Sequence, residues 1–443
     1  MRVLKIAFLL LLAGTFTGSA AAQSARKWVT AWAASPQGPY PSGNAMLQPD
    51  LRRVFPAPET GARDQSFRLI TGPDIWGQEA RIRLSNAFGT KPVTFDGVYV
   101  GLQVDSSAVV PGTNTQVLFE GSAAVTVQPG ESAWSDAVRL PFVDGMKLRD
   151  LQARKLAVSF HVVGESGPMT WHAKGLTTSY LSPSGSGSLG AIEDEAAFPY
   201  GSTSWYFLDA IDMNVSADTQ LIVAFGDSLT DGTGSTLNGD DRWPDVLSRR
   251  LHAKFDGKFA VVNAGIGGNQ VSGPPEYSPD KPYPGGPAGV RRLQRDVASL
   301  SGVSTVIWFE GINDFSKNGN ASVEAVMASF REGAQLLRSR LPGVRIIGAT
   351  VTTALGNGGP AHGFAEQDLK RQALNNFIRS SDLFDGVIDF DKVIANPETG
   401  EMKPDFVPDS TTGGPGDKLH PNRLGYLAMG QAIDLSLFGL PPS

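Results

Sequence analysis

The sequence predicts two unlike halves, an antiparallel β-sandwich followed by an α/β domain with a doubly wound parallel sheet. In the first half, short runs alternate apolar with polar residues and are separated by turns rich in Gly, Pro and Asn, a pattern typical of half-buried antiparallel strands. From about residue 218, strand-like runs alternate with helical ones, which favours a parallel sheet with crossover helices. We therefore place the sandwich at residues 23–215 and the α/β domain at residues 216–443.

The amino terminus and the composition restrict the class of protein further. Arg2 and Lys5, an apolar run at residues 6–13 and small residues ending at Ala22 predict a signal peptide over residues 1–22, and hence a secreted or periplasmic protein. No later segment is long enough to be expected to span a membrane. The formal net charge of −6 argues against a nucleic-acid partner. The absence of cysteine excludes thiolate chemistry and zinc–thiolate sites.

The first half contains predicted strands and most of the tryptophans. The alternating runs lie at residues 66–70, 80–85, 93–95 and 155–162. Six of the eight tryptophans are also in this half: Trp28, Trp32, Trp76, Trp134, Trp171 and Trp205. Such side chains could form a platform for sugar rings, but packing in the core or between domains is their more common role. We therefore expect packing.

Five strands are predicted in the second half. Their apolar runs lie at residues 222–226, 259–265, 303–309, 344–349 and 386–390. Helical patterns separate or follow them at residues 242–251, 323–340, 366–379 and 421–438. Five parallel strands of this kind predict a flavodoxin-like layout, with its crevice at the carboxyl ends of the strands. The Pro- and Gly-rich segment 271–289 is too long for an ordinary connection, so we expect it to rim that crevice.

The turn after the first of these strands presents Ser228. The apolar run stops at Gly226, and a polar, glycine-rich turn precedes the helical pattern at residues 242–251. A strand, a tight turn and a helix can lift a serine hydroxyl into the crevice. A phosphate-binding turn or a simple helix cap at Ser228 would give the same local pattern. The assignment of a nucleophile therefore depends on a base and oxyanion donors elsewhere.

Polar residues after the other strands could supply those groups. Asp417 and His420 are three residues apart, so the carboxylate can fix the tautomer of a histidine that deprotonates Ser228. The Ser228 N–H, the Gly268 N–H and the Asn313 amide would bind the oxyanion. This scheme requires no cofactor and no metal. The other histidines, whose spacing indicates no metal site, are His161, His172, His252 and His362.

Four blocks of the second half together resemble the SGNH (GDSL-type) hydrolases. They are residues 226–229, the glycine-rich stretch 263–268, residues 311–314 and residues 417–420. They occur in the family's order and cover essentially all of the second half. The resemblance implies that Ser228 is the nucleophile, His420 the base and Asp417 its orienting partner. It also implies that Gly268 and Asn313 complete the oxyanion hole.

The first half, through residues 28–37 and 81–89, resembles a branch similar to xylan-active esterases, in which a β-domain precedes the hydrolase domain. We therefore expect a secreted serine esterase that acts through an acyl-enzyme on small-molecule or polysaccharide esters, with short acyl groups on carbohydrate as the first choice. Alternatives are a lipid or aryl ester hydrolase, an acyltransferase, a non-catalytic carbohydrate-binding protein, and a flavin or phosphate binder. We expect Asp227 and Asp314 to orient loops rather than to form the carboxylate pair of a glycosidase.

Overall fold

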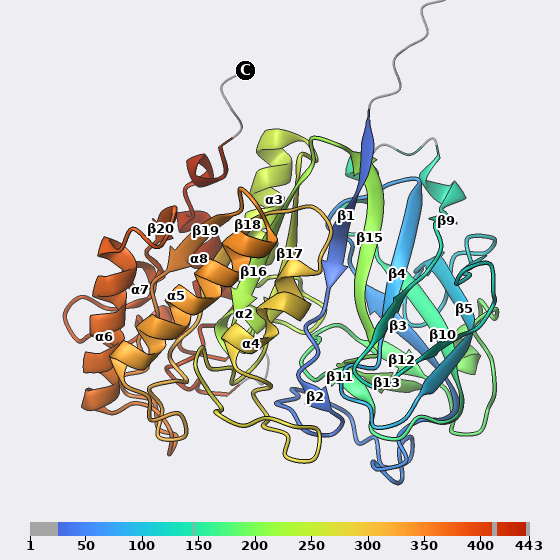
Figure 1. Ribbon diagram of the computed structural model, residues 1–443, viewed down its shortest axis with the longest axis horizontal. Coiled ribbons are helices and arrows are strands. Elements are labelled where there is room, and N and C mark those ends of the chain that lie inside the picture. Colours follow the sequence, from blue (N-terminus) through green and yellow to red (C-terminus); the bar gives the residue numbers. More distant parts are fainter. Residues whose placement is uncertain (1–24, 145, 147, 410–413, 440–443) are drawn as a thin grey trace, which may run out of the picture.

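The computed structural model describes residues 25–144, 146, 148–409 and 414–439 (Figure 1). The signal peptide expected at residues 1–22 lies outside these ranges. Strands dominate one side of the molecule, and a sheet covered by helices forms the other (Figure 1). None of the helices within the described ranges is long and apolar enough to cross a membrane.

The amino-terminal half consists of antiparallel sheets. One sheet has the order β1 (Arg26–Ala33), β15 (Leu208–Ser216), β4 (Glu79–Ser85) and β8 (Ser132–Trp134), and β9 (Val138–Arg139) also pairs with β4. A second has the order β13 (Tyr200–Ser202), β12 (Ser179–Leu181), β3 (Arg63–Thr71), β10 (Leu156–Glu165), β5 (Val93–Leu102) and β6 (Thr115–Gln116), with β7 (Val125–Val127) on β5. A third, small sheet joins β14 (Trp205–Tyr206), β11 (Thr170–His172) and β2 (Gly38–Pro39). The four strands expected here are confirmed, while a sandwich of these sheets stays a prediction.

The carboxyl-terminal half contains one parallel sheet of five strands. Its order is β17 (Phe259–Gly265), β16 (Gln220–Gly226), β18 (Val303–Phe309), β19 (Arg345–Ala349) and β20 (Gly386–Ile388). The first strand in the chain therefore lies second in the sheet, which is the expected flavodoxin-like order. Gly226 pairs with both Gly265 and Phe309, so three strands end level with one another. The turns after these strands therefore lie together at the carboxyl end of the sheet.

Helices connect the parallel strands much as the sequence predicts. They are α2 (Ser228–Asp231), α3 (Trp243–Phe255), α4 (Gly289–Leu293), α5 (Val323–Arg340), α6 (Ala365–Ser380), α7 (Phe390–Ile394) and α8 (Arg423–Ala432); the short α1 (Leu148–Leu151) belongs to the first half. The single last helix expected at residues 421–438 is wrong. The observed helix α8 ends at Ala432, because Arg250 donates hydrogen bonds to the carbonyls of Gly430 and Ile433 at 2.6 and 2.7 Å. Asp434 then caps a separate short helical turn.

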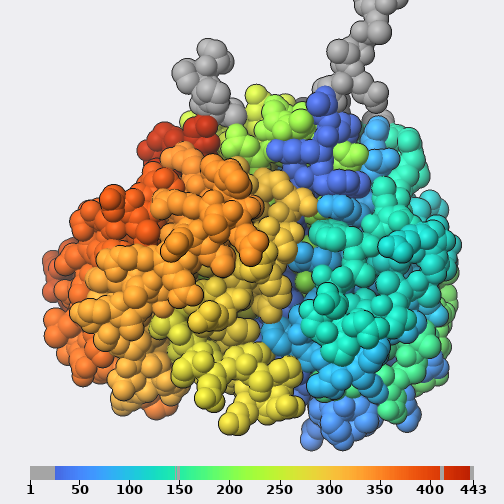
Figure 2. All heavy atoms as spheres, in the orientation of Figure 1, coloured from blue at the N-terminus to red at the C-terminus, as the bar shows by residue number. Residues whose placement is uncertain are grey.

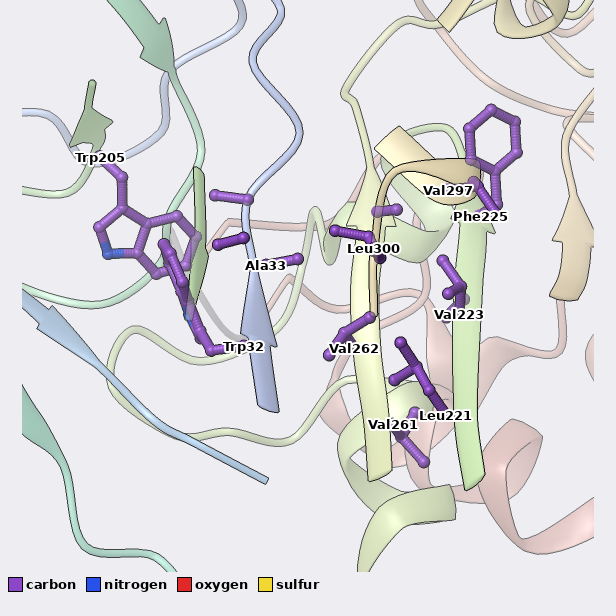
Figure 3. Packing of buried hydrophobic residues seen from close by; sticks show 14 of the residues in the cluster. Trp32, Ala33, Trp205, Leu221, Val223, Phe225, Val261, Val262, Val297 and Leu300 are labelled. Carbon is purple, nitrogen blue, oxygen red and sulfur yellow. The ribbon is translucent and has the colours of Figure 1, made fainter. Parts of the chain in front are cut away.

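The two halves share a hydrophobic core. The larger hydrophobic cluster of the described residues includes Ala33 of β1, Val262 of β17 and Val223 of β16, and Figure 3 shows Ala33 and Val262 on neighbouring strands of the cluster. The backbone also joins the halves, since Thr30 N–H donates to Ser301 O at 3.0 Å. One core therefore continues across the junction, and the domain boundary after residue 215 stays a prediction.

Asp74 closes the edge of the parallel sheet from the amino-terminal half. Its carboxylate accepts the N–H of Val261 on the edge strand β17 at 2.6 Å and the hydroxyl of Ser248 on α3. His252 of α3 lies 3.3 Å from the same carboxylate. Edge strands leave backbone groups unpaired unless something covers them. Asp74 therefore covers part of this edge.

We expect Asp74→Ala to lower the free energy of unfolding by about 1–3 kcal/mol, because it leaves the N–H of Val261 without its acceptor. Urea denaturation followed by tryptophan fluorescence measures this change. Asp382→Ala, which removes an exposed carboxylate, is the control and should change stability by less than about 0.5 kcal/mol. Equal midpoints for the two variants would contradict the role given to Asp74.

Candidate active site

Ser228 lies at the first position of α2, immediately after the turn that ends β16. The helix is capped by Asp227, whose side chain accepts the N–H of Leu229 at 2.9 Å, so the interpretation of Ser228 as a mere cap is wrong. Gly226 makes the turn possible. A Cβ at this position would lie 2.1 Å from the carbonyl oxygen of Phe309. The turn therefore packs tightly against β18 and leaves the Ser228 side chain at the end of the sheet, 6% exposed.

A chain of hydrogen bonds joins Ser228 to a loop almost two hundred residues later. The Ser228 hydroxyl is 2.8 Å from Nε2 of His420, and Nδ1 of His420 is 2.6 Å from Oδ2 of Asp417. The other Asp417 oxygen accepts the N–H groups of Leu419 and His420 at 2.9 and 2.8 Å. Burial raises the pKa of Asp417, but the bonds from His420 outweigh it and hold the pKa below its usual range. The carboxylate therefore stays ionised beside the imidazole.

The expected oxyanion donors lie on neighbouring turns. Gly268 has φ +83°, a left-handed conformation that favours glycine. The Asn313 amide donates to Asn269 O at 2.9 Å, which joins the turn after β18 to the one after β17. Ile266 N–H donates to Gly226 O at 3.0 Å. This bond joins the turn after β17 to the end of β16, two residues before Ser228. The N–H groups of Ser228 and Gly268 have no acceptor among the described residues.

A buried arginine, which the sequence analysis missed, fixes these turns. Arg292 of α4 donates to the carbonyls of Gly226 and Ala264 at 2.7 and 2.8 Å and to Asn269 Oδ1 at 2.6 Å. Its guanidinium lies 3.9 Å from the ring centroid of Phe225. The ends of β16 and β17 and the Gly268 turn are therefore held by one side chain. Nothing in the local pattern of residues 289–293 distinguishes this arginine from its exposed neighbour at 291.

Acidic residues beneath the turns orient loops, as expected. Asp314 accepts the N–H groups of Val271 and Ser272 at 2.8 and 2.9 Å, and burial raises its pKa and that of Asp227. Glu310 is also buried and accepts the indole N–H of Trp308 at 2.9 Å. Burial raises the pKa of Glu310 to about 7, against the opposing effect of Arg292.

The segment at residues 271–289 returns to the site and rims it. Asn269 donates its amide to Gly285 O at 2.7 Å, and Gly285 lies so close to Gly268 that a Cβ would be 2.2 Å from the Gly268 carbonyl. Gln37 of the amino-terminal half donates to Pro284 O at 2.7 Å. Figure 2 shows this segment, in yellow, beside the blue and cyan amino-terminal half.

The tryptophans of the first half mainly serve packing. Trp32 and Trp205 are buried and meet edge to face at 4.9 Å, and both are labelled in Figure 3. Trp76 and Trp171 are also buried. A platform for sugar rings is therefore not formed by these four side chains.

Residues of the amino-terminal half also reach the site, and most of them were not predicted. His172 lies at this junction, since its Nε2 is 3.1 Å from Oδ1 of Asp231 on α2. Asn44 donates to Gly267 O at 2.8 Å. Lys174 donates to the Thr233 hydroxyl. Asn44 and Lys174 have no neighbouring motif that would have identified them.

His362 lies at the opposite side of the site. Its Nδ1 accepts the amide of Gln367 at 2.7 Å, and the same amide lies 3.2 Å from Ile312 O. Burial and the nearby His420 lower the pKa of His362 to about 4. A neutral imidazole with Nδ1 already occupied can offer only its Nε2–H to a ligand.

A family model matches most of the carboxyl-terminal half of the chain. Residues 224–428 match the model of the GDSL-like Lipase/Acylhydrolase family. No curated protein matches the chain. Similar solved structures include a carbohydrate acetylesterase, Est24, from Sinorhizobium meliloti (15% identity, 48% of this chain and 96% of that one, TM-score 0.35). They also include an aryl esterase of M. smegmatis (18%, 48% and 96%, 0.36) and a lipase/acylhydrolase from Enterococcus faecalis (23%, 48% and 93%, 0.35).

Because Glu310 keeps its proton in the folded protein up to about pH 7, its contribution to stability is fully present below about pH 4.5 and is lost as the pH rises through 7. We expect Glu310→Gln to remove this loss. Relative to the wild type, the variant should gain up to about 3 kcal/mol of unfolding free energy between pH 4.5 and pH 8. Urea denaturation at both pH values measures the gain, with Glu276→Gln on an exposed loop as control. A difference that is the same at both pH values would refute the assignment.

Proposed function

We propose that this serine ester hydrolase, whose residues 224–428 form a GDSL-like lipase/acylhydrolase domain, uses Ser228 as nucleophile, His420 as base and Asp417 as its orienting partner. One observation carries the proposal: the hydrogen-bonded chain from the Ser228 hydroxyl through both nitrogens of His420 to Asp417, with separations of 2.8 and 2.6 Å. An ionised carboxylate at Nδ1 keeps the proton there, which leaves Nε2 free to accept the serine proton.

The steps follow from the positions of these groups. His420 takes the proton of Ser228 as the oxygen attacks the ester carbonyl, and the N–H groups of Ser228 and Gly268 and the Asn313 amide bind the oxyanion. Neither of the two backbone N–H groups has an acceptor among the residues that the structure describes, which supports this role. His420 then protonates the leaving alcohol. A water deprotonated by the same imidazole attacks the acyl-enzyme and releases the acid.

The substrate we propose is a short acyl group on a carbohydrate, of which acetylated xylan is an example. Polar side chains at the rim support it, because sugar hydroxyls need hydrogen-bond partners. These side chains include Asn44 beside Gly268, Tyr283 bonded to Gln270 at 2.9 Å, and His362. Export through a signal peptide at residues 1–22 and a division into domains after residue 215 belong to the same proposal. Lipid or aryl ester hydrolysis and acyl transfer are the alternatives.

We expect Ser228→Ala and His420→Ala each to lower kcat by about 10⁴-fold or more, and the double variant to lose little further, because the residues act as one unit. Hydrolysis of p-nitrophenyl acetate measures kcat. Labelling by a fluorophosphonate is the companion measurement: wild type should label, and Ser228→Ala should not. Additive losses, or labelling that survives the loss of Ser228, would overturn the assignment.

A panel of substrates tests the acyl and alcohol specificity. We expect activity on p-nitrophenyl esters to fall as the acyl chain lengthens beyond about four carbons, and acetate to be released from acetylated polysaccharide. Activity that increases with chain length and spares acetylated polysaccharide would favour a lipid ester. Transfer of the acyl group to an added sugar, without release of acid, would favour an acyltransferase.

A further inference from the structure

The turn that carries Gly267 and Gly268 is held from both halves of the protein. On one side, Asp231 of α2 accepts the Gly267 N–H at 2.8 Å. On the other, Asn44 of the amino-terminal half donates to the Gly267 carbonyl at 2.8 Å. A Cβ placed on Gly268 would lie 2.7 Å from the Asn44 amide. The first half therefore forms one wall of the proposed oxyanion hole.

Lys174 reaches the same turn and is buried, with 3% of its surface exposed. It follows β11, and its ammonium donates to the hydroxyl of Thr233. A Cβ on Gly267 would be 2.7 Å from Nζ, so the ammonium lies directly against the turn. Burial lowers the pKa of Lys174, while Asp231, Asp227 and Asp417 act in the opposite direction.

Two other cations at the junction of the halves, half-buried Lys155 and buried Arg83, have carboxylate partners of their own. Lys155 pairs with Asp240 at 2.8 Å and Arg83 with Asp209 at 2.6 Å. Lys174 forms no ion pair with any carboxylate in the part of the chain that the structure describes. A buried charge without a paired carboxylate is costly. The ammonium of Lys174 lies beside the Gly267–Gly268 turn, where negative charge would develop during the proposed reaction. A functional role there would explain why this lysine is buried without a carboxylate partner.

We propose that Lys174 is a positioning residue of the ester hydrolase site, which acts through Thr233 and the Gly267–Gly268 turn and places a fixed positive charge beside the oxyanion hole. The proposal rests on the function proposed above. Thr233 connects the ammonium to the nucleophile, because its N–H donates to the Ser228 carbonyl at 3.0 Å. The amino-terminal half thus takes part in the reaction through one lysine.

The fixed charge has two effects. It favours the oxyanion over the neutral carbonyl, so it lowers the barrier without tightening substrate binding. A fixed positive charge also opposes the uptake of a further proton by the site as a whole, so it should affect the pH profile of the reaction. The titratable and charged groups around Lys174 and the loop of Asp417 are Asp417, His362, Asp231, Asp227 and His172. A role limited to packing would produce neither effect.

Two pairs of variants in the full-length chain test the proposal. Lys174→Met removes the charge and keeps the length of the side chain, and Lys155→Met removes a lysine of the same junction that lies away from the turn. Thr233→Val removes the acceptor of the ammonium, and Thr233→Ser restores it. For each variant, kcat, KM and the acid limb of kcat/KM against pH are measured with p-nitrophenyl acetate, and folding is checked by thermal denaturation.

We expect Lys174→Met to lower kcat by about 10- to 100-fold with KM within about threefold of the wild type, and to move the acid limb about 0.5 pH unit upward. Thr233→Val should lower kcat severalfold, Thr233→Ser should match the wild type, and Lys155→Met should leave kcat and the acid limb unchanged.

Wild-type kcat in Lys174→Met would overturn the proposal, as would a lower kcat with an unmoved acid limb, which would indicate packing alone. If Lys174→Met does not fold, the Thr233 pair decides: equal kcat for Val and Ser overturns the proposal. The proposed function fails separately, if the wild type neither hydrolyses the ester nor labels with a fluorophosphonate at Ser228.

Discussion

The buried guanidinium of Arg292 hydrogen-bonds at once to the ends of two parallel strands and to the loop that carries Gly268. Because each of its nitrogens has a partner and Phe225 lies under its plane, a charge that would otherwise be costly to bury becomes a rigid junction. Ser228 follows one of these strands directly. The positions of the proposed nucleophile and of the proposed oxyanion donor Gly268 therefore depend on the same side chain.

Local patterns predicted much of this structure. Apolar periodicity identified all five parallel strands. A short motif at the end of β16 pointed to Ser228, and a second in the loop before α8 pointed to Asp417 and His420. Contacts between distant segments left no such pattern. Lys174 and Asn44 look like ordinary loop residues in the sequence, and their contacts with Thr233 and Gly267 join segments far apart in the chain. The error at residues 421–438 has the same origin, because the helix is ended by Arg250, a residue of α3 far away in the chain.

The site gathers ionisable groups of two kinds. Asp417 lies at the surface loop, ionised and in contact with His420, whereas Glu310 and Asp314 lie under the sheet edge, where burial raises their pKa values. The first kind has the proposed catalytic role, and the second accepts hydrogen bonds from backbone and side-chain N–H groups. The sequence alone does not distinguish these two kinds of carboxylate, since a carboxylate in a loop can have either role. Their burial and hydrogen-bond partners in the fold distinguish them.

Asp74 and β1 pack against the edge strand β17, and this contact limits how the two halves of the protein can be separated. The α/β half, expressed in a fusion protein without the amino-terminal half, would expose the N–H of Val261 on the edge strand β17 and the apolar side chains that β1 covers. Such a chimera would be prone to self-association. Chimeric proteins are therefore best made by exchanging surface loops, with both halves and the contact between them kept together.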